Sequence, residues 1–258
     1  MRNRYIALLL VAGTARAAAQ SPQEVAAAAD RVFAQWNSSS SPGCAVGVAR
    51  RGQVLLVRGY GMAQLETGTP ITPATIFESG SVAKQFTAAA TLVLAADGKL
   101  SLDDPVRKYV PELPDYGRPL LVRHLLDHTS GLREWSNLVA LAGWPRGTRV
   151  HTQADLLEVI VAQKALNYPV GEFYSYTNSG FALLTTIIER VSGKSFAQFT
   201  KERIFEPLGM TNSGWRDDFT RVVPGRAQAY ARAQDGSWVL AMPFENVVGP
   251  GGDAHHGG

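Results

Sequence analysis

Residues 81–96 place the strongest constraint on the fold, because they predict one long helix that is apolar on most of its surface. Alanines, leucines and one valine fill the middle of this segment, and Asp97 and Gly98 end it. A helix of this kind is buried on most sides. The rest of the chain must therefore supply the elements that cover it.

Other segments carry clear helix and strand patterns. Ser21 and Pro22 open a helix over residues 21–36. Two short runs rich in β-branched residues, 44–49 and 53–60, predict a β-hairpin. Further helices are expected at residues 122–127, 153–163, 181–191 and 196–205.

Two strands followed by many helices predict an α/β fold of the α+β type. Two strands alone make a poor sheet. Either later segments pair with the hairpin, or the chain lacks the remaining strands. The composition supports a globular protein, since 45% of the 258 residues are hydrophobic and 18% are charged.

The net charge of +3 belongs to the first twenty residues. They hold Arg2, Arg4 and Arg16 and no acidic residue, and the remaining 22 basic residues equal the 22 acidic ones. The body of the chain is therefore neutral, which gives no electrostatic basis for binding nucleic acid.

Residues 1–20 have the order of regions found in a secretory signal peptide. A basic start precedes the apolar run 5–13, and small residues follow at 15–19. The run is too short to span a bilayer, and a buried N-terminal helix is the alternative. We expect a secreted or periplasmic protein with no stable membrane span. Cys44 is the only cysteine, so no internal disulfide forms, and its apolar neighbours predict a buried small side chain.

Ser81 and Lys84 are candidates for a catalytic pair. Their spacing of three places both on one face of a helix. Ser81 would stand at the helix N-terminus, where free backbone N–H groups stabilise the anion that forms during acyl transfer. A serine nucleophile needs a base, and burial favours the neutral amine of Lys84 that this role requires. The alternative is an ordinary helix cap followed by an unremarkable lysine.

Tyr176 and Asn178 form a second candidate pair. They are two residues apart, so on an extended loop both side chains would project the same way. A tyrosine can relay a proton, and an asparagine can donate to a substrate carbonyl. The alternative is a turn with a packed tyrosine.

Several segments resemble a known family when they are taken together and in order. They are 77–87 (FESGSVAKQFT), 124–132 (HLLDHTSGL), 176–178 (YTN), 206–210 (EPLGM) and 249–252 (GPGG). From about Gly43 to Gly252 the chain is similar to serine β-lactamases and penicillin-binding proteins. It resembles most the branch with class C β-lactamases, D-aminopeptidases and esterases.

The resemblance implies a β-lactamase/DD-peptidase-like fold, with an antiparallel sheet flanked by helices and a helical subdomain. It implies that Ser81 is acylated and that Lys84 and Tyr176 share the general base and acid work. Asn178 would bind the substrate, and the Ser81 N–H would form half of the oxyanion hole. The substrate would be a β-lactam, a D-amino-acid peptide or an ester, with no cofactor and no metal. Tyr176 stands where class A enzymes carry Ser-Asp-Asn.

The family's third motif, Lys-Thr-Gly or His-x-Gly on a later strand, is not found. The chain ends six residues after Gly252, and the run 256–258 (HGG) stands too early to serve. We therefore expect residues 21–258 to form a hydrolase domain that is incomplete at its C-terminus and lacks strands of the sheet. The second oxyanion donor would be missing, a loss that typically costs about 100- to 1,000-fold in rate.

Two other interpretations remain open. His124 and His128 have a spacing found in metal sites, with Asp127 beside them, so a metal hydrolase is one. A relative without turnover that binds peptidoglycan or a partner protein is the other. Three tryptophans could line a cleft or anchor the core, namely Trp135, Trp144 and Trp215.

Overall fold

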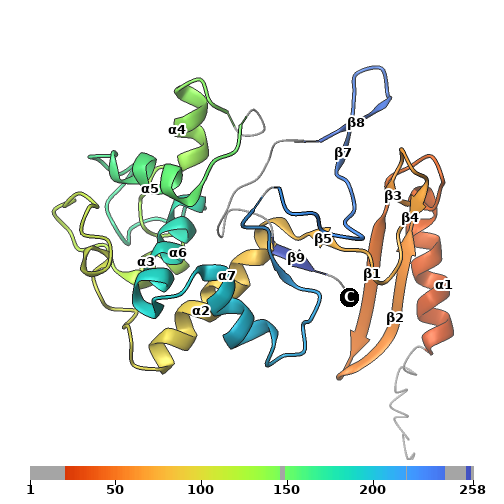
Figure 1. The fold of residues 1–258 in the computed structure, drawn as a ribbon, viewed down its shortest axis with the longest axis horizontal. Coiled ribbons are helices and arrows are strands. Elements are labelled where there is room, and N and C mark those ends of the chain that lie inside the picture. Colours follow the sequence, from red (N-terminus) through yellow and green to blue (C-terminus); the bar gives the residue numbers. More distant parts are fainter. Residues whose placement is uncertain (1–20, 146–148, 219, 242–253, 257–258) are drawn as a thin grey trace, which may run out of the picture.

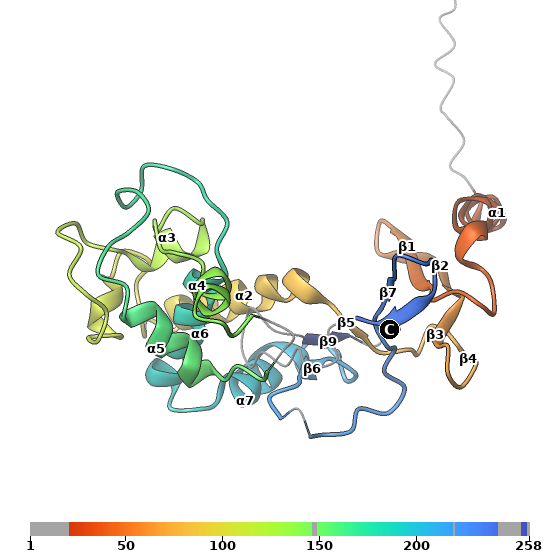
Figure 2. The ribbon, with the colours of Figure 1, turned by 90° about the horizontal axis from the view of Figure 1, so that it is seen from above.

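The computed structural model describes residues 21–145, 149–218, 220–241 and 254–256. Most helices gather on one side, which we call the helical half: α2 (Lys84–Ala96), α3 (Val122–Leu126), α4 (Trp135–Leu141), α5 (Gln153–Val161), α6 (Asn178–Ser192) and α7 (Phe196–Thr200). The opposite side, the strand half, holds α1 (Pro22–Phe33) and most of the short strands (Figure 1). Figure 2 shows α2 beginning near the boundary between the halves and running into the helical half.

The strands form small antiparallel sheets. In the strand half, β1 (Cys44–Arg50) pairs with β2 (Gln53–Tyr60), β3 (Met62–Gln64) with β4 (Thr69–Pro70), and β7 (Tyr230–Arg232) with β8 (Trp238–Leu240). Between the halves, β9 (Ala254–His256) pairs with β5 (Phe77–Glu78) and β6 (Gly214–Trp215) (Figure 1). The predicted hairpin is thus confirmed, as is the mixed α/β class.

A tight turn joins the two strands of the hairpin. Arg51 and Gly52 both adopt left-handed backbone conformations, with φ of 51° and 79°. Two such residues in succession match the right-handed twist of paired strands. The pairing shifts between Val48 and Ala49, where Leu55 is the extra residue, which marks a bulge in β2.

Helix α1 covers one face of the hairpin. The Ser21 hydroxyl accepts a bond from the Glu24 N–H, and the Glu24 carboxylate accepts one from the Ser21 N–H, so the helix begins with a capping box. Val25 and Ala29 pack against Leu56 of β2. The helix predicted at 21–36 is therefore confirmed, with Ala34–Trp36 as a 3₁₀ extension.

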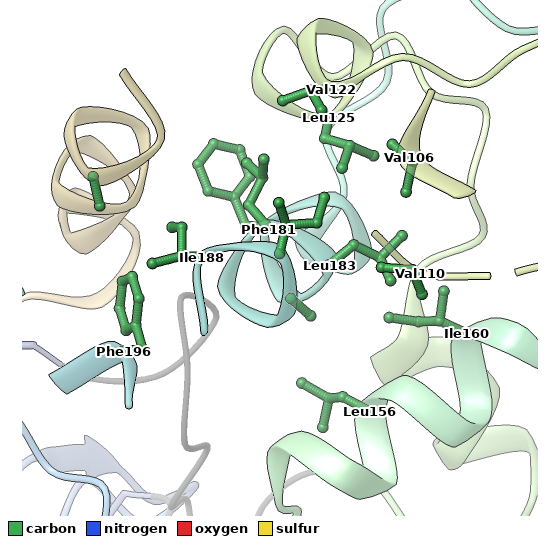
Figure 3. Close-up of a cluster of buried hydrophobic side chains, with 14 of the residues drawn as sticks. Val106, Val110, Val122, Leu125, Leu156, Ile160, Phe181, Leu183, Ile188 and Phe196 are labelled. Atoms are coloured by element: carbon green, nitrogen blue, oxygen red, sulfur yellow. The ribbon is translucent and has the colours of Figure 1, made fainter. Parts of the chain in front are cut away.

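The main core lies around α6 in the helical half. This helix contacts α2, α3, α4, α5 and α7. Leu183 and Ile188 are fully buried, and Figure 3 shows side chains from several surrounding elements packed around α6. Ala90 and Leu94 of α2 are also fully buried, as expected for the apolar helix. The core therefore fixes α2 and α6, which carry Lys84 and Asn178 and directly follow Ser81 and Tyr176.

Some predicted boundaries were wrong. The α-helix begins at Lys84, because residues Gly80–Ala83 form a tighter 3₁₀ turn that leads into it. The helix predicted at 181 begins at Asn178, because Thr177 supplies an N-cap. The helix expected at 196–205 is α7 followed by a π-helical turn, Lys201–Phe205. Sequence patterns did not predict α4.

Several single-residue predictions have mixed outcomes. Cys44 is only partly buried, and this burial raises the pKa of its thiol. Trp135 and Trp215 are buried in the core, whereas Trp144 is exposed beside the pocket between α4 and α5. Residues 1–20 and the glycine-rich run 249–252 lie outside the described residues. Within the described residues, no helix is long and apolar enough to cross a membrane.

Candidate active site

Ser81 belongs to the short segment that joins β5 to α2, three residues after β5 ends. It is exposed and belongs to the 3₁₀ turn Gly80–Ala83. The first internal bond of this turn runs from the Val82 N–H to the Ser79 carbonyl, at 3.2 Å. The Ser81 N–H comes before that bond, at the end of the helix where backbone donors are free for a ligand.

Lys84 brings a buried amine to the Ser81 side chain. Only 7% of Lys84 is exposed. Its Nζ donates to Ser81 Oγ at 3.2 Å and to Asn178 Oδ1 at 2.7 Å. The same atom lies 4.9 Å from the ring centre of Tyr176 and 5.5 Å from that of Phe181. The amine is thus held between two oxygens and two aromatic rings.

Tyr176 is 95 positions away from Ser81 in the sequence, yet its side chain contacts the serine. Its hydroxyl is hydrogen-bonded to Ser81 Oγ at 2.6 Å and donates to Asn178 Oδ1 at 3.4 Å. The structure therefore brings together Ser81, Lys84, Tyr176 and Asn178. Because Tyr176 is 45% exposed, the hydroxyl cluster is open to a ligand.

The helix cap of α6 explains why Tyr176 and Asn178 face the same site. Thr177 is extended, with φ of −146° and ψ of 140°, and its Oγ1 accepts from the Ser179 N–H at 3.2 Å. Tyr176 precedes this cap and Asn178 is the first helical residue. The expectation that both lie on one extended loop was therefore wrong for Asn178, although their side chains still converge.

Glu134 is a site residue that sequence reasoning missed. It caps α4, and its carboxylate accepts bonds from the Asn178 N–H at 2.5 Å, the Asn178 Nδ2 at 3.0 Å and the Thr177 hydroxyl at 2.9 Å. Burial is the largest single influence on the pKa of Glu134 and raises it. These bonds and one from Ser136 together lower the pKa by more, so it lies below its usual value. No local pattern marks its role in the site, because its partners Thr177 and Asn178 are more than forty positions away.

His128 contacts the segment that holds Tyr176 and Thr177. Its Nδ1 accepts from the Thr177 N–H at 3.3 Å, and its ring centre lies 4.6 Å from that of Tyr176 and 5.1 Å from that of Phe181. His128 has a φ of 59°, which is uncommon for a residue other than glycine. The Nδ1 bond requires a ring that is unprotonated at that nitrogen.

The two histidines are arranged for backbone contacts. The Nδ1 of His124 accepts from the Leu121 N–H at 3.2 Å, as that of His128 does from Thr177. Within the described residues, no group of three or more His, Cys, Asp or Glu side chains is placed to hold a metal ion. The geometry therefore gives the metal-hydrolase interpretation no ligand set in this part of the chain.

The arrangement of serine, lysine, tyrosine and asparagine can be compared with known proteins. The Beta-lactamase family model matches residues 27–257. The chain belongs to this family. It is 33% identical over 184 residues to penicillin-binding protein 4* of Bacillus subtilis, which covers 71% of this chain and 40% of that protein. It is 38% identical over 170 residues to a D-aminopeptidase of Brucella anthropi, which covers 66% of this chain and 32% of the relative.

Solved structures of β-lactamase-family proteins share the fold. An octameric penicillin-binding protein homologue from Pyrococcus abyssi superposes with a TM-score of 0.78 at 30% identity, over 91% of this chain and 54% of that one. D-amino acid amidase from Ochrobactrum anthropi SV3 gives 0.74 at 20% identity, over 89% and 68%. The predicted family and fold class are confirmed. The chain spans less than half the length of the two curated relatives described above.

We expect the stability of this β-lactamase-family chain to fall as the pH drops below about 6.5, the usual pKa of an unfolded histidine. Burial is the largest cause that lowers the pKa of both His128 and His124. Below pH 6.5 the unfolded state binds protons that the folded state does not, so the free energy of unfolding decreases.

Urea denaturation at pH 8.0 and 5.5 measures this loss of stability. The variant His128→Asn, which keeps a residue tolerant of positive φ, should show a smaller loss between the two values. Aspartate and glutamate side chains titrate at lower pH, outside the range from 5.5 to 8.0. Equal stability of the wild-type chain at both values would contradict the prediction.

Proposed function

We propose that this chain is a serine hydrolase that acts through an acyl-enzyme formed on Ser81. The observation that carries the proposal is the approach of two proton-transfer groups to one exposed serine. The Tyr176 hydroxyl and the Lys84 amine lie 2.6 and 3.2 Å from Ser81 Oγ. A serine hydroxyl with bases at hydrogen-bond distance is the arrangement that nucleophilic catalysis requires.

In the first step, Ser81 Oγ attacks the carbonyl carbon of the substrate, and its proton passes to the pair formed by Lys84 and Tyr176. The carbonyl oxygen becomes an anion beside the Ser81 N–H, at the positive end of the 3₁₀ turn and α2. The Asn178 amide has a second Nδ2 hydrogen that can donate to a substrate carbonyl. Collapse of this intermediate breaks the C–N or C–O bond, and the leaving atom takes the transferred proton.

In the second step, water hydrolyses the ester on Ser81. The same pair removes a proton from the water as its oxygen attacks the acyl carbon, and it returns a proton to Ser81 Oγ as the acyl group leaves. The products are a free acid and the original enzyme. Lys84 and Tyr176 thus act as base and acid in turn, and no cofactor is needed.

The proposed substrates are small molecules or peptides with an amide, β-lactam or ester bond. The names of the relatives, which include D-aminopeptidases and penicillin-binding proteins, support this range. We further propose that residues 1–20 are a signal peptide and that residues 21–258 belong to a secreted or periplasmic hydrolase domain. The order of basic, apolar and small residues supports export.

Covalent labelling tests the nucleophile. The wild-type chain is incubated in parallel with a fluorescent fluorophosphonate and a fluorescent penicillin, and the labelled residue is found by mass spectrometry of intact protein and peptides. We expect one label on Ser81 and none in Ser81→Ala. Ser175→Ala, which removes an exposed serine beside Tyr176, serves as the matched control and should be labelled like the wild type.

Two outcomes would overturn the proposal. A label that persists in Ser81→Ala would show that another residue is the nucleophile. A folded wild-type chain that accepts neither probe would favour a non-catalytic relative that binds peptidoglycan or a partner protein.

A further inference from the structure

Glu134 is a partly buried carboxylate surrounded by neutral donors. It receives two bonds from Asn178, one from the Thr177 hydroxyl and two from Ser136, whose N–H and Oγ lie at 3.4 and 2.9 Å. Within the part of the chain that the structure describes, no ion pair involves this carboxylate. A charged group placed where five neutral donors converge is held in a fixed position and orientation.

The carboxylate determines which way the Asn178 amide faces. An ionised carboxylate can only accept hydrogen bonds, so the NH₂ end of the Asn178 amide must point to Glu134, at 3.0 Å. The oxygen of the same amide then points to Lys84 Nζ, at 2.7 Å. The reversed amide would place its NH₂ group against the lysine amine, and two donors would face each other.

The loop that carries Glu134 is attached to the start of α6 by two further bonds. Ser179 Oγ donates to the Arg133 carbonyl at 2.6 Å and accepts from the Trp135 N–H at 2.9 Å. Ser179 and Trp135 are fully buried. Both neighbours of Glu134 are therefore fixed to the helix that begins with Asn178, so the carboxylate keeps its place relative to the amide.

We propose that Glu134 is a positioning residue for acylation: through Asn178 it holds the Lys84 amine against Ser81. This role rests on the proposed function, because it concerns the base that activates the nucleophile. The contacts run from Glu134 to Asn178 Nδ2, from Asn178 Oδ1 to Lys84 Nζ, and from Lys84 Nζ to Ser81 Oγ. Glu134 itself touches neither the serine nor the lysine among these contacts.

The variant Glu134→Gln separates this role from simple packing. Glutamine has the same size, but one end of its side chain is a donor. At one carboxylate position this donor would face Asn178 Nδ2 and Ser136, and at the other it would face the Asn178 N–H and the Thr177 hydroxyl. The Asn178 amide then loses its preference for the orientation that serves Lys84. Because small displacements of a catalytic group cost on the order of 100-fold in rate, we expect fluorophosphonate labelling of Ser81 to slow by about 100-fold.

A double-mutant cycle supplies the deciding measurement. Labelling rates are measured for the wild type, Glu134→Gln, Asn178→Ala and the double variant. If Glu134 acts through Asn178, its replacement should change the rate by less than about threefold in the Asn178→Ala background. Ser136→Ala is the matched control, because it removes one neutral donor to the same carboxylate without touching Asn178, and it should be labelled like the wild type. Circular dichroism verifies that each variant is folded.

The orientation of the amide can also be read without any reaction. In ¹⁵N-labelled protein, the Asn178 side-chain resonances are assigned by their loss in Asn178→Ala. They should move in Glu134→Gln and stay in place in Ser136→Ala. Unchanged resonances in Glu134→Gln would overturn the orienting role.

The remaining outcomes are distinct. Labelling of Glu134→Gln at the wild-type rate, or an equal loss in both backgrounds, would refute action through Asn178. A wild-type chain that takes no label on Ser81 would instead overturn the proposed function, and with it the role in acylation. The amide resonances would still decide whether Glu134 orients Asn178.

Discussion

Replacing Lys84 with methionine is expected to slow the acylation of Ser81 by about 1,000-fold, within the range that a positioned base contributes. Lys84 Nζ lies 3.2 Å from Ser81 Oγ, and the proposed mechanism uses this amine to accept the serine proton. Methionine fills a similar volume, so the surrounding rings of Tyr176 and Phe181 keep a packing partner. The variant should therefore remain folded while it loses reactivity.

Stopped-flow fluorescence with a fluorophosphonate measures this rate. Lys99→Met, which replaces an exposed lysine just beyond the C-terminal end of α2, is the control and should react like the wild type. Residual labelling in Lys84→Met is attributed to the Tyr176 hydroxyl. A rate within tenfold of the wild type would argue that Tyr176 alone removes the serine proton.

Replacing Gly131 with alanine is expected to lower the free energy of unfolding by about 3 kcal/mol, since left-handed strain and overpacking each cost on the order of 1–3 kcal/mol. Gly131 has a φ of 71°, and a Cβ added there would lie 2.2 Å from the backbone oxygen of Tyr168. The carbonyl of Gly131 also accepts from the Asn167 N–H at 2.8 Å, so neither segment can move alone.

Thermal unfolding tests this prediction. A loss of about 3 kcal/mol corresponds to a midpoint lower by about 10 °C for a chain of this size. Gly193→Ala is the matched control, because Gly193 has a φ of 70° but nothing within 4 Å of an added Cβ. It measures the backbone strain alone and should lower the midpoint less. Equal effects of the two substitutions would show that the Tyr168 contact costs nothing.

Gly131 also lies between His128 and Glu134, which both support the segment that begins at Tyr176. A shift of this loop should therefore reduce labelling of Ser81 in the Gly131→Ala chain that remains folded. Labelling at the wild-type rate in that variant would indicate that the site tolerates movement of the loop.

The sequence predicted the parts of the site that depend on local spacing. Ser81 and Lys84 are three residues apart, and helical periodicity alone brings them to one face. The apolar segment that follows them predicted the buried α2. The hairpin was also predictable, because its β-branched runs and its Arg-Gly turn lie next to each other.

The parts that depend on long-range contacts could not be predicted in this way. Glu134 and His128 gain their roles only when the loop before α4 meets the start of α6. The start of α6 itself carried a usable signal, since Thr177 is a good N-cap residue followed by a helical pattern. The 3₁₀ turn at Ser81 gave no such signal, because its sequence is equally compatible with an α-helical first turn.

The division into two halves has a consequence for how the protein can change. Ser81, Lys84, Tyr176 and Asn178 are all supplied by α2, by α6 and by the segments that lead into them. Glu134 and His128, which support them, also belong to the helical half. Mutations in the strand half can therefore accumulate without replacing any of the proposed proton-transfer groups. Under the proposed function, the strand half can thus be varied, in evolution or by engineering, while every proposed reactive group is kept.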